Sequence, residues 1–461
     1  MRRLYSSQFY KNLPTPFQNS LVSLKGVAYS TLRGGRRFTF FQKELLDNER
    51  LDSCRLSEIQ LGKLKELLMH AYENVPFYRK QFDDVGFNPK GLTSLDDIKR
   101  IPILEKETLR KHPDQFTASN VSKRILFKGS TSGSTGTPLS LKMDRELIQR
   151  EHAFVWRQYR WAGCPVNGCV ACFRGDMIVP VEQKKPPYWR FDKWSNEIWF
   201  SSYHISMDTV PAYIEALRKY QPDLIYAYPS SIALIARCAL EMKLPISIDS
   251  LRGIVTSSET LQENDKALLQ NLFNVRVFDW YGAFERVVFI GTCEFGRYHI
   301  FPDYGVTELI PMEHPNCELM YEIIGTGFMN SYMPLIRYRT GDTVTARGGT
   351  CECGRPFPLV ESINGRLDDM IVTTDGRKIG RLDHIFKGVD HVKMSQIIQE
   401  RLDEIKIVVV VDPLYGEPDR EAILANVAER LGAEMKVQID VVPDIPRLPS
   451  GKFRGVISYL N

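Results

Sequence analysis

The chain has 461 residues, of which 43% are hydrophobic, 25% charged and 11% aromatic, with a formal net charge of +4. This composition is that of a folded globular protein, and the length predicts two or three domains. The excess of positive charge is too small for the basic surface of a nucleic-acid-binding protein, so we expect no nucleic-acid partner.

No run of the sequence reaches the roughly 18 apolar residues that a membrane helix needs. Polar residues and two prolines interrupt residues 4–20, which argues against a signal peptide. The cysteines number nine. An odd number without a secretory signal predicts a cytoplasmic protein with reduced thiols, some of them available to a metal.

Residues 1–55 are expected to form an N-terminal strap. Segment 18–40 mixes aliphatic and aromatic residues with four basic ones, Lys25, Arg33, Arg36 and Arg37. We favour a strap packed on the main body. The alternative is peripheral association of this segment with an anionic membrane surface.

A large domain is expected over residues 56–365. Near its start, Ser57-Glu58-Ile59-Gln60 resembles a capping box, and apolar residues follow at helical spacing. This pattern predicts a helix that begins at Ser57 and ends before Pro76.

A loop rich in glycine and hydroxyl residues follows an apolar run at 125–127. Glycine allows close approach of the backbone, and successive N–H groups and hydroxyls can wrap a phosphate. No Gly-Lys-Ser/Thr ends the loop, so it is not the common P-loop. A flexible linker is the alternative. The candidate phosphate-binding residues are Thr131, Ser132, Gly133, Ser134, Thr135 and Gly136.

Strands and helices then alternate, which predicts an α/β fold with a mostly parallel sheet flanked by helices. The expected strands are Gly168–Phe173, Ile198–Tyr203, Leu224–Tyr228, Gly253–Thr256 and Val275–Trp280. The expected helices are Arg145–Trp161, Asp208–Tyr220, Ser230–Lys243 and Thr260–Phe273. Ligands of such sheets bind at the carboxyl ends of the strands.

Two of the loops that follow strands contain candidate ligand-binding residues. Ser258 and Glu259 come after the fourth strand, and the sequence from Tyr281 through Gly282 to Glu285 follows the fifth. A tyrosine ring can stack on a purine, and a carboxylate can hold Mg²⁺. Ordinary loop chemistry is the alternative for each loop taken alone.

The pattern of residues changes after residue 300. Short alternating runs over 301–365 predict a small antiparallel or barrel-like subdomain within the large domain. Its turn Tyr338-Arg339-Thr340-Gly341-Asp342 offers Asp342 to the hydroxyls of a ribose.

Residues 366–461 are expected to form a small, mobile α+β lid domain. Within it we expect helices at 394–405 and 418–431 and strands at 406–411 and 436–442. The domain ends in a loop rich in proline and glycine that carries Lys452, a candidate mobile cation. A solvated surface lysine is the alternative.

These motifs occur together in the order typical of the adenylate-forming superfamily, the group of acyl-CoA synthetases, peptide-synthetase adenylation domains and luciferase. They include Gly-Arg-x-Asp-Asp at 365–369 and Pro-Arg-x-x-Ser-Gly-Lys at 446–452. Within the superfamily the chain most resembles the phenylacetate–CoA ligase-like branch. His70 to Tyr78 resembles the entry motif of that branch. The chain is most similar to the CapK proteins of capsule and polysaccharide gene clusters, also labelled coenzyme F390 synthetase-like, and the tail Gly451 to Arg454 also resembles CapK.

The resemblance implies a two-step reaction. ATP and a small carboxylic acid give an acyl-adenylate and pyrophosphate, and the acyl group then passes to a thiol of CoA or a carrier, or to the amine of an amino sugar. Such a reaction would serve the assembly of cell-surface polysaccharide. An adenylyltransferase that stops at AMP transfer and a non-catalytic nucleotide-binding scaffold are the alternatives.

The resemblance also implies roles for single residues. Thr131, Ser132, Ser134 and Thr135 would hold phosphates, and Glu285 would hold Mg²⁺. Tyr281 would stack on adenine near Ser258 and Glu259, Asp342 would hold the ribose, and Arg366 would reach ribose and phosphates. Lys452 would bridge carboxylate and α-phosphate, and Asp368 would be the hinge of the lid. The chain departs from the superfamily pattern at Leu139, often a lysine, and at Phe284, usually a threonine.

Two further sites are expected. Cys293, His299, Cys351 and Cys353 supply three sulfurs and one imidazole, which suit a closed structural Zn²⁺ site, with unpaired thiols as the alternative. The acid is expected to bind among Tyr226, Tyr228, Ser230 and Ala283, where the aromatic residues suit an aryl or small acyl group.

Overall fold

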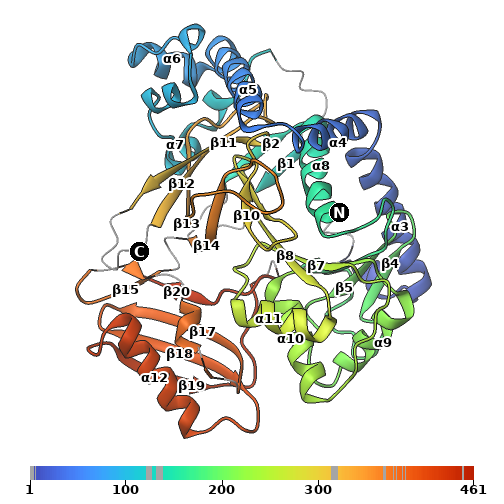
Figure 1. Ribbon diagram of the computed structural model, residues 1–461. Helices are drawn as coiled ribbons and strands as arrows, with labels where there is room; N and C mark the ends of the chain where they lie inside the picture. The colour runs from blue at the N-terminus through green and yellow to red at the C-terminus, as the bar shows by residue number, and fades with distance from the viewer. Residues whose placement is uncertain are drawn as a thin grey trace.

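The computed structural model describes residues 5, 7–120, 127–130, 139–312, 320–366, 370–376, 378–379, 382–386, 388–389, 391–448 and 451–460. They form a large body around a 12-stranded sheet and a smaller body around a four-stranded sheet (Figure 1). The smaller body, in orange and red, lies beside α10 (Pro229–Glu241) of the large one. An ion pair of 2.5 Å between Lys393 Nζ and Glu241 Oε2 joins the two bodies.

The N-terminal strap consists of α2 (Gln8–Lys11), α3 (Thr15–Arg33) and α4 (Arg36–Asn48). The last two pack on α8 (Arg145–Trp161), and α3 also covers the edge strand β4 (Trp189–Asp192). Apolar side chains such as Val22 and Leu45 are buried in these contacts. The strap therefore packs on the main body, as we expected.

A helical segment of short elements follows the strap. It contains α5 (Ser53–Asn74), α6 (Pro76–Asp84), α7 (Lys106–Lys111) and the 3₁₀ turns η1 (Pro89–Gly91), η2 (Leu95–Arg100) and η3 (Pro113–Phe116). The predicted start at Ser57 is wrong, because Asp52 caps the helix by accepting a hydrogen bond from the backbone N–H of Arg55. Pro76 opens α6, so α5 ends where we expected.

The large sheet has the strand order β11-β12-β13-β14-β10-β9-β8-β7-β6-β3-β5-β4. Its parallel strands are β3 (Val170–Arg174), β5 (Glu197–Ser201), β6 (Leu224–Ala227), β7 (Gly253–Ser257) and β8 (Arg276–Gly282). Helices α8, α9 (Val210–Tyr220), α10 and α11 (Glu263–Phe273) alternate with them along the chain. The predicted α/β fold is confirmed, with boundaries within a few residues of those expected.

Antiparallel strands extend this sheet. They are β9 (Phe289–Thr292), β10 (Tyr298–Ile300), β11 (Gly305–Pro311), β12 (Met320–Gly327), β13 (Tyr338–Ala346) and β14 (Leu359–Arg366). The strands of 301–365 are antiparallel, and the β10–β14 pairing joins them to the large sheet. A separate pair, β1 (Phe127–Ser130) and β2 (Ser140–Met143), flanks the glycine-rich loop, which itself lies outside the described residues.

The smaller body has its own core and a sheet of order β19-β18-β17-β20. Its elements are β15 (Ile371–Val372), β16 (Lys378–Ile379), η5 (Leu382–Phe386), β17 (Val392–Arg401), β18 (Glu404–Val411), α12 (Glu417–Leu431), β19 (Lys436–Val441) and β20 (Val456–Ser458). The helix predicted at 394–405 is wrong, since that segment is β17, which forms a hairpin with β18. Among the described residues, no helix is long and apolar enough to cross a membrane.

Candidate active site

The centre of the large sheet contains a point where the chain changes direction. Strand β3 continues to β5 on one side, whereas its other neighbour β6 continues to β7 on the opposite side. Connections that leave adjacent parallel strands in opposite directions open a crevice between the strands' carboxyl ends, and ligands bind there. Arg174 ends β3, and Tyr226 and Tyr228 lie at the end of β6. We refer to this region as the strand-end crevice.

Polar groups from β7 border the strand-end crevice. Ser257 ends this strand, and its hydroxyl lies 3.1 Å from that of Tyr226. Ser258 follows with a φ of 73°, a left-handed conformation that is uncommon for a residue with a side chain. Both serine hydroxyls accept hydrogen bonds from the Arg174 guanidinium, at 2.7 and 3.1 Å. Strained backbone of this kind concentrates at functional sites.

The next strand contributes Tyr281, which pairs with the residue expected to hold a ribose. The Tyr281 hydroxyl donates to Asp342 Oδ2 at 2.6 Å, and Arg366 Nε lies 3.7 Å from the other Asp342 oxygen. Burial first, and then the Asp342 charge, raise the pKa of Tyr281 well above its usual value. The hydroxyl is therefore protonated and orients the carboxylate as a donor. Three predicted residues from β8, β13 and β14 thus lie together.

Glu285, the expected Mg²⁺ ligand, lies just beyond β8. One of its oxygens, Oε1, accepts a hydrogen bond of 2.9 Å from the buried Tyr338 hydroxyl. Ala283 of the same loop is buried, and Phe284 packs against the main core. The Tyr338 bond orients Glu285, and a carboxylate oxygen is a ligand type that Mg²⁺ accepts.

Glu259 connects the large body to the C-terminal loop. Its Oε2 accepts from the backbone N–H of Ser230 at 3.0 Å, in the first turn of α10, where a carboxylate is favoured by the helix dipole. Its Oε1 accepts from the backbone N–H of Phe453 at 2.5 Å. One carboxylate therefore holds both a helix start and the loop that carries Lys452.

Other contacts hold the same loop against the crevice. Arg447 Nη1 donates to Ser230 Oγ at 2.7 Å. Gly451 has a φ of +78°, and a Cβ built there would lie 2.3 Å from the Cα of Gly175. Only glycine allows so close an approach at that backbone conformation. The loop therefore docks directly beside the end of β3.

Lys452 lies in this docked loop and is partly buried. Burial lowers the pKa of Lys452, and the positive charges of Arg174 and Arg366 add to this effect, while Glu259 and Asp342 oppose it. Because a burial-depressed ammonium gains from an anionic partner, the surroundings favour a negative ligand beside it. Lys452 is not a solvated surface lysine in this arrangement.

Some predicted residues lie outside the part that the structure describes. These are the loop residues Thr131 to Gly136 and the expected hinge Asp368. The sequence reasoning also passed over Arg174, which the structure places at the centre of the strand-end crevice. The available signal was its position directly after a buried strand.

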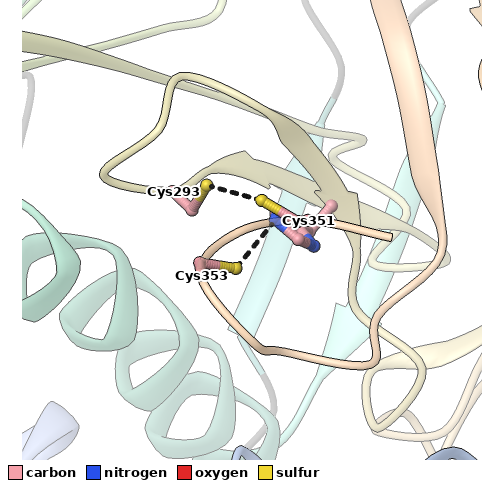
Figure 2. Close-up of side chains that lie close together, drawn as sticks. Cys293, Cys351 and Cys353 are labelled. Carbon is pink, nitrogen blue, oxygen red and sulfur yellow. Dashed lines mark hydrogen bonds between the residues drawn. The ribbon is translucent and has the colours of Figure 1, made fainter. Parts of the chain in front are cut away.

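The predicted Cys/His group comes together. The ligand atoms of Cys293, His299, Cys351 and Cys353 all lie within 4.8 Å of one another. Two pairs are closer: Cys293 Sγ is 3.6 Å from Cys351 Sγ, and Cys353 Sγ is 3.4 Å from His299 Nε2. Figure 2 shows the Cys293 thiol, from the loop after β9, close to the thiols of Cys351 and Cys353 in the 351–353 turn.

Histidine orientation at this cluster is set by a second contact. His299 Nδ1 lies 3.3 Å from the carbonyl oxygen of Phe357, so that nitrogen carries the proton and Nε2 points to the thiols. Burial lowers the pKa of His299 to about 4 and raises that of Cys293 to about 12. The imidazole is thus neutral, the form that binds a metal.

The arrangement has counterparts of known structure. The fold matches 2-hydroxyisobutyryl-CoA ligase in the postadenylation state in complex with R3-HIB-AMP, with a TM-score of 0.69 at 20% identity over 90% of this chain and 91% of the other. Large and small bodies together therefore have the fold of an adenylate-forming CoA ligase.

Sequence comparisons identify relatives of the whole chain. It is 27% identical to protein CapK of Staphylococcus aureus, over 98% of this chain and 99% of the relative. It is 24% identical to the phenylacetate-coenzyme A ligase of Thermus thermophilus, over 90% and 99% of the two chains. Residues 371–459 match the family model of the CapK C-terminal domain. The chain is a homologue of CapK and of phenylacetate-CoA ligases, and the resemblance seen in the motifs is confirmed.

Proposed function

We propose that the protein activates a carboxylic acid with ATP as an acyl-adenylate and transfers the acyl group to a thiol. The observation that carries this proposal is the docking of the Lys452 loop on the strand-end crevice through Glu259, Ser230 and Gly451. Docking brings a desolvated cation to the site where the motif residues of the large body converge. The names of the relatives, phenylacetate-CoA ligase and 2-hydroxyisobutyryl-CoA ligase, support the same reaction class.

The first step is attack of a carboxylate oxygen on the α-phosphorus of ATP. A new P–O bond forms, the bond to the β-phosphate breaks, and pyrophosphate leaves. Such transfers depend on positioning and charge neutralisation rather than on covalent help. Lys452 would neutralise the carboxylate and α-phosphate, Asp342 would hold the ribose hydroxyls with Tyr281 stacked on adenine, and Thr131, Ser132, Ser134 and Thr135 would hold the outgoing phosphates.

Mg²⁺ would neutralise phosphate charge when bound. Glu285 is the residue we assign to it, because Tyr338 already orients this carboxylate. The Phe284 side chain lacks the hydroxyl that the superfamily usually offers here, so the backbone of the loop must hold the adenylate at this point.

The second step transfers the acyl group to an acceptor. We propose a thiol of CoA or of a carrier as the acceptor, and CoA is named in the relatives and matched structures. The amine of an amino sugar is the alternative. Either acceptor would fit a role in cell-surface polysaccharide assembly, and a swing of the lid about Asp368 would exchange the two half-reactions.

The test measures pyrophosphate release with ATP, Mg²⁺ and a panel of acids, trapping the acyl group with hydroxylamine. We expect acid-dependent release that Lys452→Ala lowers by about 100-fold or more, because transition-state charge stabilisation is lost. Lys436→Ala, an exposed lysine of the same domain, is the matched control. Release without any acid dependence would contradict acyl activation, and a stable AMP-modified acceptor would indicate the adenylyltransferase.

We also propose that Cys293, His299, Cys351 and Cys353 bind a structural Zn²⁺. Three thiolates and a neutral imidazole are a common donor set for zinc, and bonds of about 2.3 Å place tetrahedral sulfurs about 3.8 Å apart. The 3.6 Å between Cys293 and Cys351 sulfurs agrees with that spacing. Four protein ligands leave no position for a substrate, so the role is to hold the loop after β9 to the 351–353 turn.

The packed strap still exposes apolar side chains on its outer face, and we further propose that this face contacts anionic membranes. Phe17 and Leu24, one heptad apart on α3, are 61% and 64% exposed. Trp194, 63% exposed, donates a hydrogen bond of 2.6 Å to Ser30 near the end of the same helix. Aromatic and basic residues together suit a bilayer interface. Sedimentation with phosphatidylglycerol vesicles should fall for the double variant Phe17→Ser/Leu24→Ser and not for Leu414→Ser, and equal sedimentation would refute the contact.

A further inference from the structure

Arg174 stands in the strand-end crevice without a part in the adenylation chemistry proposed above. It is the last residue of β3, at the point where the connections from β3 and β6 diverge. Its guanidinium lies 4.5 Å from the centre of the Tyr226 ring and 4.3 Å from that of Tyr228. These two tyrosines are residues that we expected to line the acid pocket.

The guanidinium is held rigidly. Its Nη1 donates to Ser257 and its Nη2 to Ser258, while the two aromatic faces fix its plane. Arginine has five N–H donors, so these two bonds leave others for a ligand. A planar, pre-oriented guanidinium is suited to a carboxylate or phosphate, which it binds through paired hydrogen bonds.

The charge of Arg174 lacks a close counter-ion within the described residues. The groups that accept its hydrogen bonds are neutral hydroxyls, and none of the ion pairs among the described residues involves it. Asp176 acts on it from a greater distance and also faces Lys25 of the strap. A partly buried cation surrounded by aromatic rings gains more from an anion than an exposed one, because the local dielectric is low.

A second cation borders the same space. After burial, Arg174 is the strongest influence that lowers the pKa of Lys452, so the two positive charges act on one region. Lys452 is assigned to the carboxylate that becomes activated. The other positive charge, that of Arg174, lies against Tyr226 and Tyr228, where we expect the rest of the acid to bind.

We propose that Arg174 pairs with a second anionic group of the acid, so that the substrate is a carboxylic acid carrying a further carboxylate, phosphate or sulfate. This inference rests on the proposed function and narrows its substrate class. The tyrosine rings would then enclose the carbon chain between the two anionic ends. A neutral aryl acid would instead cover Arg174 without pairing it, which is costly for a buried charge.

The experiment compares acids matched in length that differ by one charge: succinate with butyrate, glutarate with valerate, and phthalate with benzoate. Acid-dependent pyrophosphate release is measured for wild type, Arg174→Met and the control Arg276→Met, an exposed arginine at the opposite end of β8. We expect wild type to prefer the dianionic partner in kcat/KM. Arg174→Met should lower kcat/KM for the diacid by about 100-fold and for the monoacid by less than about threefold, the size expected for removing one partner of a buried charge pair.

Several outcomes would overturn the inference. Equal use of both acids by wild type would refute it and leave the proposed function intact. An equal loss for both acids in Arg174→Met, with a raised KM for ATP, would assign Arg174 to the nucleotide. Equilibrium binding of the same acid pairs, by calorimetry, needs no turnover. Diacid preference in binding that Arg174→Met abolishes would support the inference even where pyrophosphate release fails, and no preference in binding would refute it.

Discussion

The contact between Tyr281 and Asp342 gives the sharpest residue-scale prediction. Tyr281→Phe keeps the ring for stacking and removes the 2.6 Å hydrogen bond that orients Asp342. A hydrogen bond to a charged group contributes about 1.5–3 kcal/mol, so we expect the KM for ATP to rise about 10- to 150-fold. The kcat should change less, because Lys452 is untouched.

Steady-state kinetics of pyrophosphate release measures this change, with Tyr459→Phe as the control, since that tyrosine is exposed just beyond β20 of the small body. An unchanged KM for ATP would mean that the contact between Tyr281 and Asp342 does not contribute to nucleotide binding.

The ionisation of Lys452 predicts a pH effect at the same scale. Burial and the neighbouring positive charges lower its pKa, so its proton is lost at a lower pH than from an ordinary lysine. In the proposed reaction, the ammonium form of Lys452 would neutralise the α-phosphate. The rate of adenylation should therefore be highest at neutral pH. It should decline at alkaline pH, with a midpoint below the usual lysine pKa of about 10.4.

The pH profile of pyrophosphate release, measured between neutral and alkaline pH, checks this expectation. The alkaline decline should disappear from the residual activity of Lys452→Ala. A decline that persists unchanged in that variant would belong to another group.

At the scale of elements, periodicity predicted the centre of the large sheet because each strand and helix there carries its own local pattern. Helix α8 has the predicted boundaries, Arg145 and Trp161. The helix predicted at 394–405 was wrong because Ile398, Leu402 and Ile405 recur at a helical spacing although most of the segment is strand β17. Its state is decided by pairing with β18 and β20, contacts that a local pattern does not contain.

The residues of the candidate site also divide into those that a local pattern predicts and those that depend on contacts distant in the sequence. Residues in motifs, such as Glu259 and Asp342, were found because each lies in a recognisable loop, although their contacts with the lid and with Tyr281 emerged from the structure. Arg174 lies in no motif, and its one local signal is its position at the end of a buried strand. Its importance comes from the strand order around β3, which places it at the point where the connections diverge.

The Cys/His cluster gives a prediction for a pair of elements. We expect protein purified without chelator to contain about one Zn²⁺ per chain, the content of a closed four-ligand site. Cys351→Ser should lose the zinc and unfold at a lower temperature, because the loop after β9 and the 351–353 turn lose their link. Cys54→Ser, at an exposed cysteine of α5, is the matched control.

Metal analysis and thermal unfolding measure the two effects. Treatment of the wild type with a strong chelator should lower its unfolding temperature and leave Cys351→Ser unchanged. Wild-type protein that contains no metal and unfolds at the same temperature as Cys351→Ser would refute the zinc site.

For the whole molecule, docking of the C-terminal loop includes one close backbone approach, between Gly451 and Gly175. Gly451→Ala adds a Cβ that would lie 2.3 Å from the Cα of Gly175, at a φ of +78° that alanine disfavours. The loop can then no longer carry Lys452 to the strand-end crevice. We expect acid-dependent pyrophosphate release to fall about 100-fold or more, as for loss of Lys452 itself, while acyl transfer from a supplied acyl-adenylate to the thiol proceeds at a near wild-type rate.

Gly455→Ala is the matched control, because it lies four residues further along the same segment, where the nearest atom to an added Cβ is 3.8 Å away. It should retain both half-reactions. A loss of both half-reactions in folded Gly451→Ala would mean that one docked arrangement serves the entire cycle. In the proposed reaction the docked arrangement would bring Lys452 to the phosphate bond that breaks, and a thiol must later reach the same carbonyl carbon. We therefore expect the two half-reactions to separate in this variant.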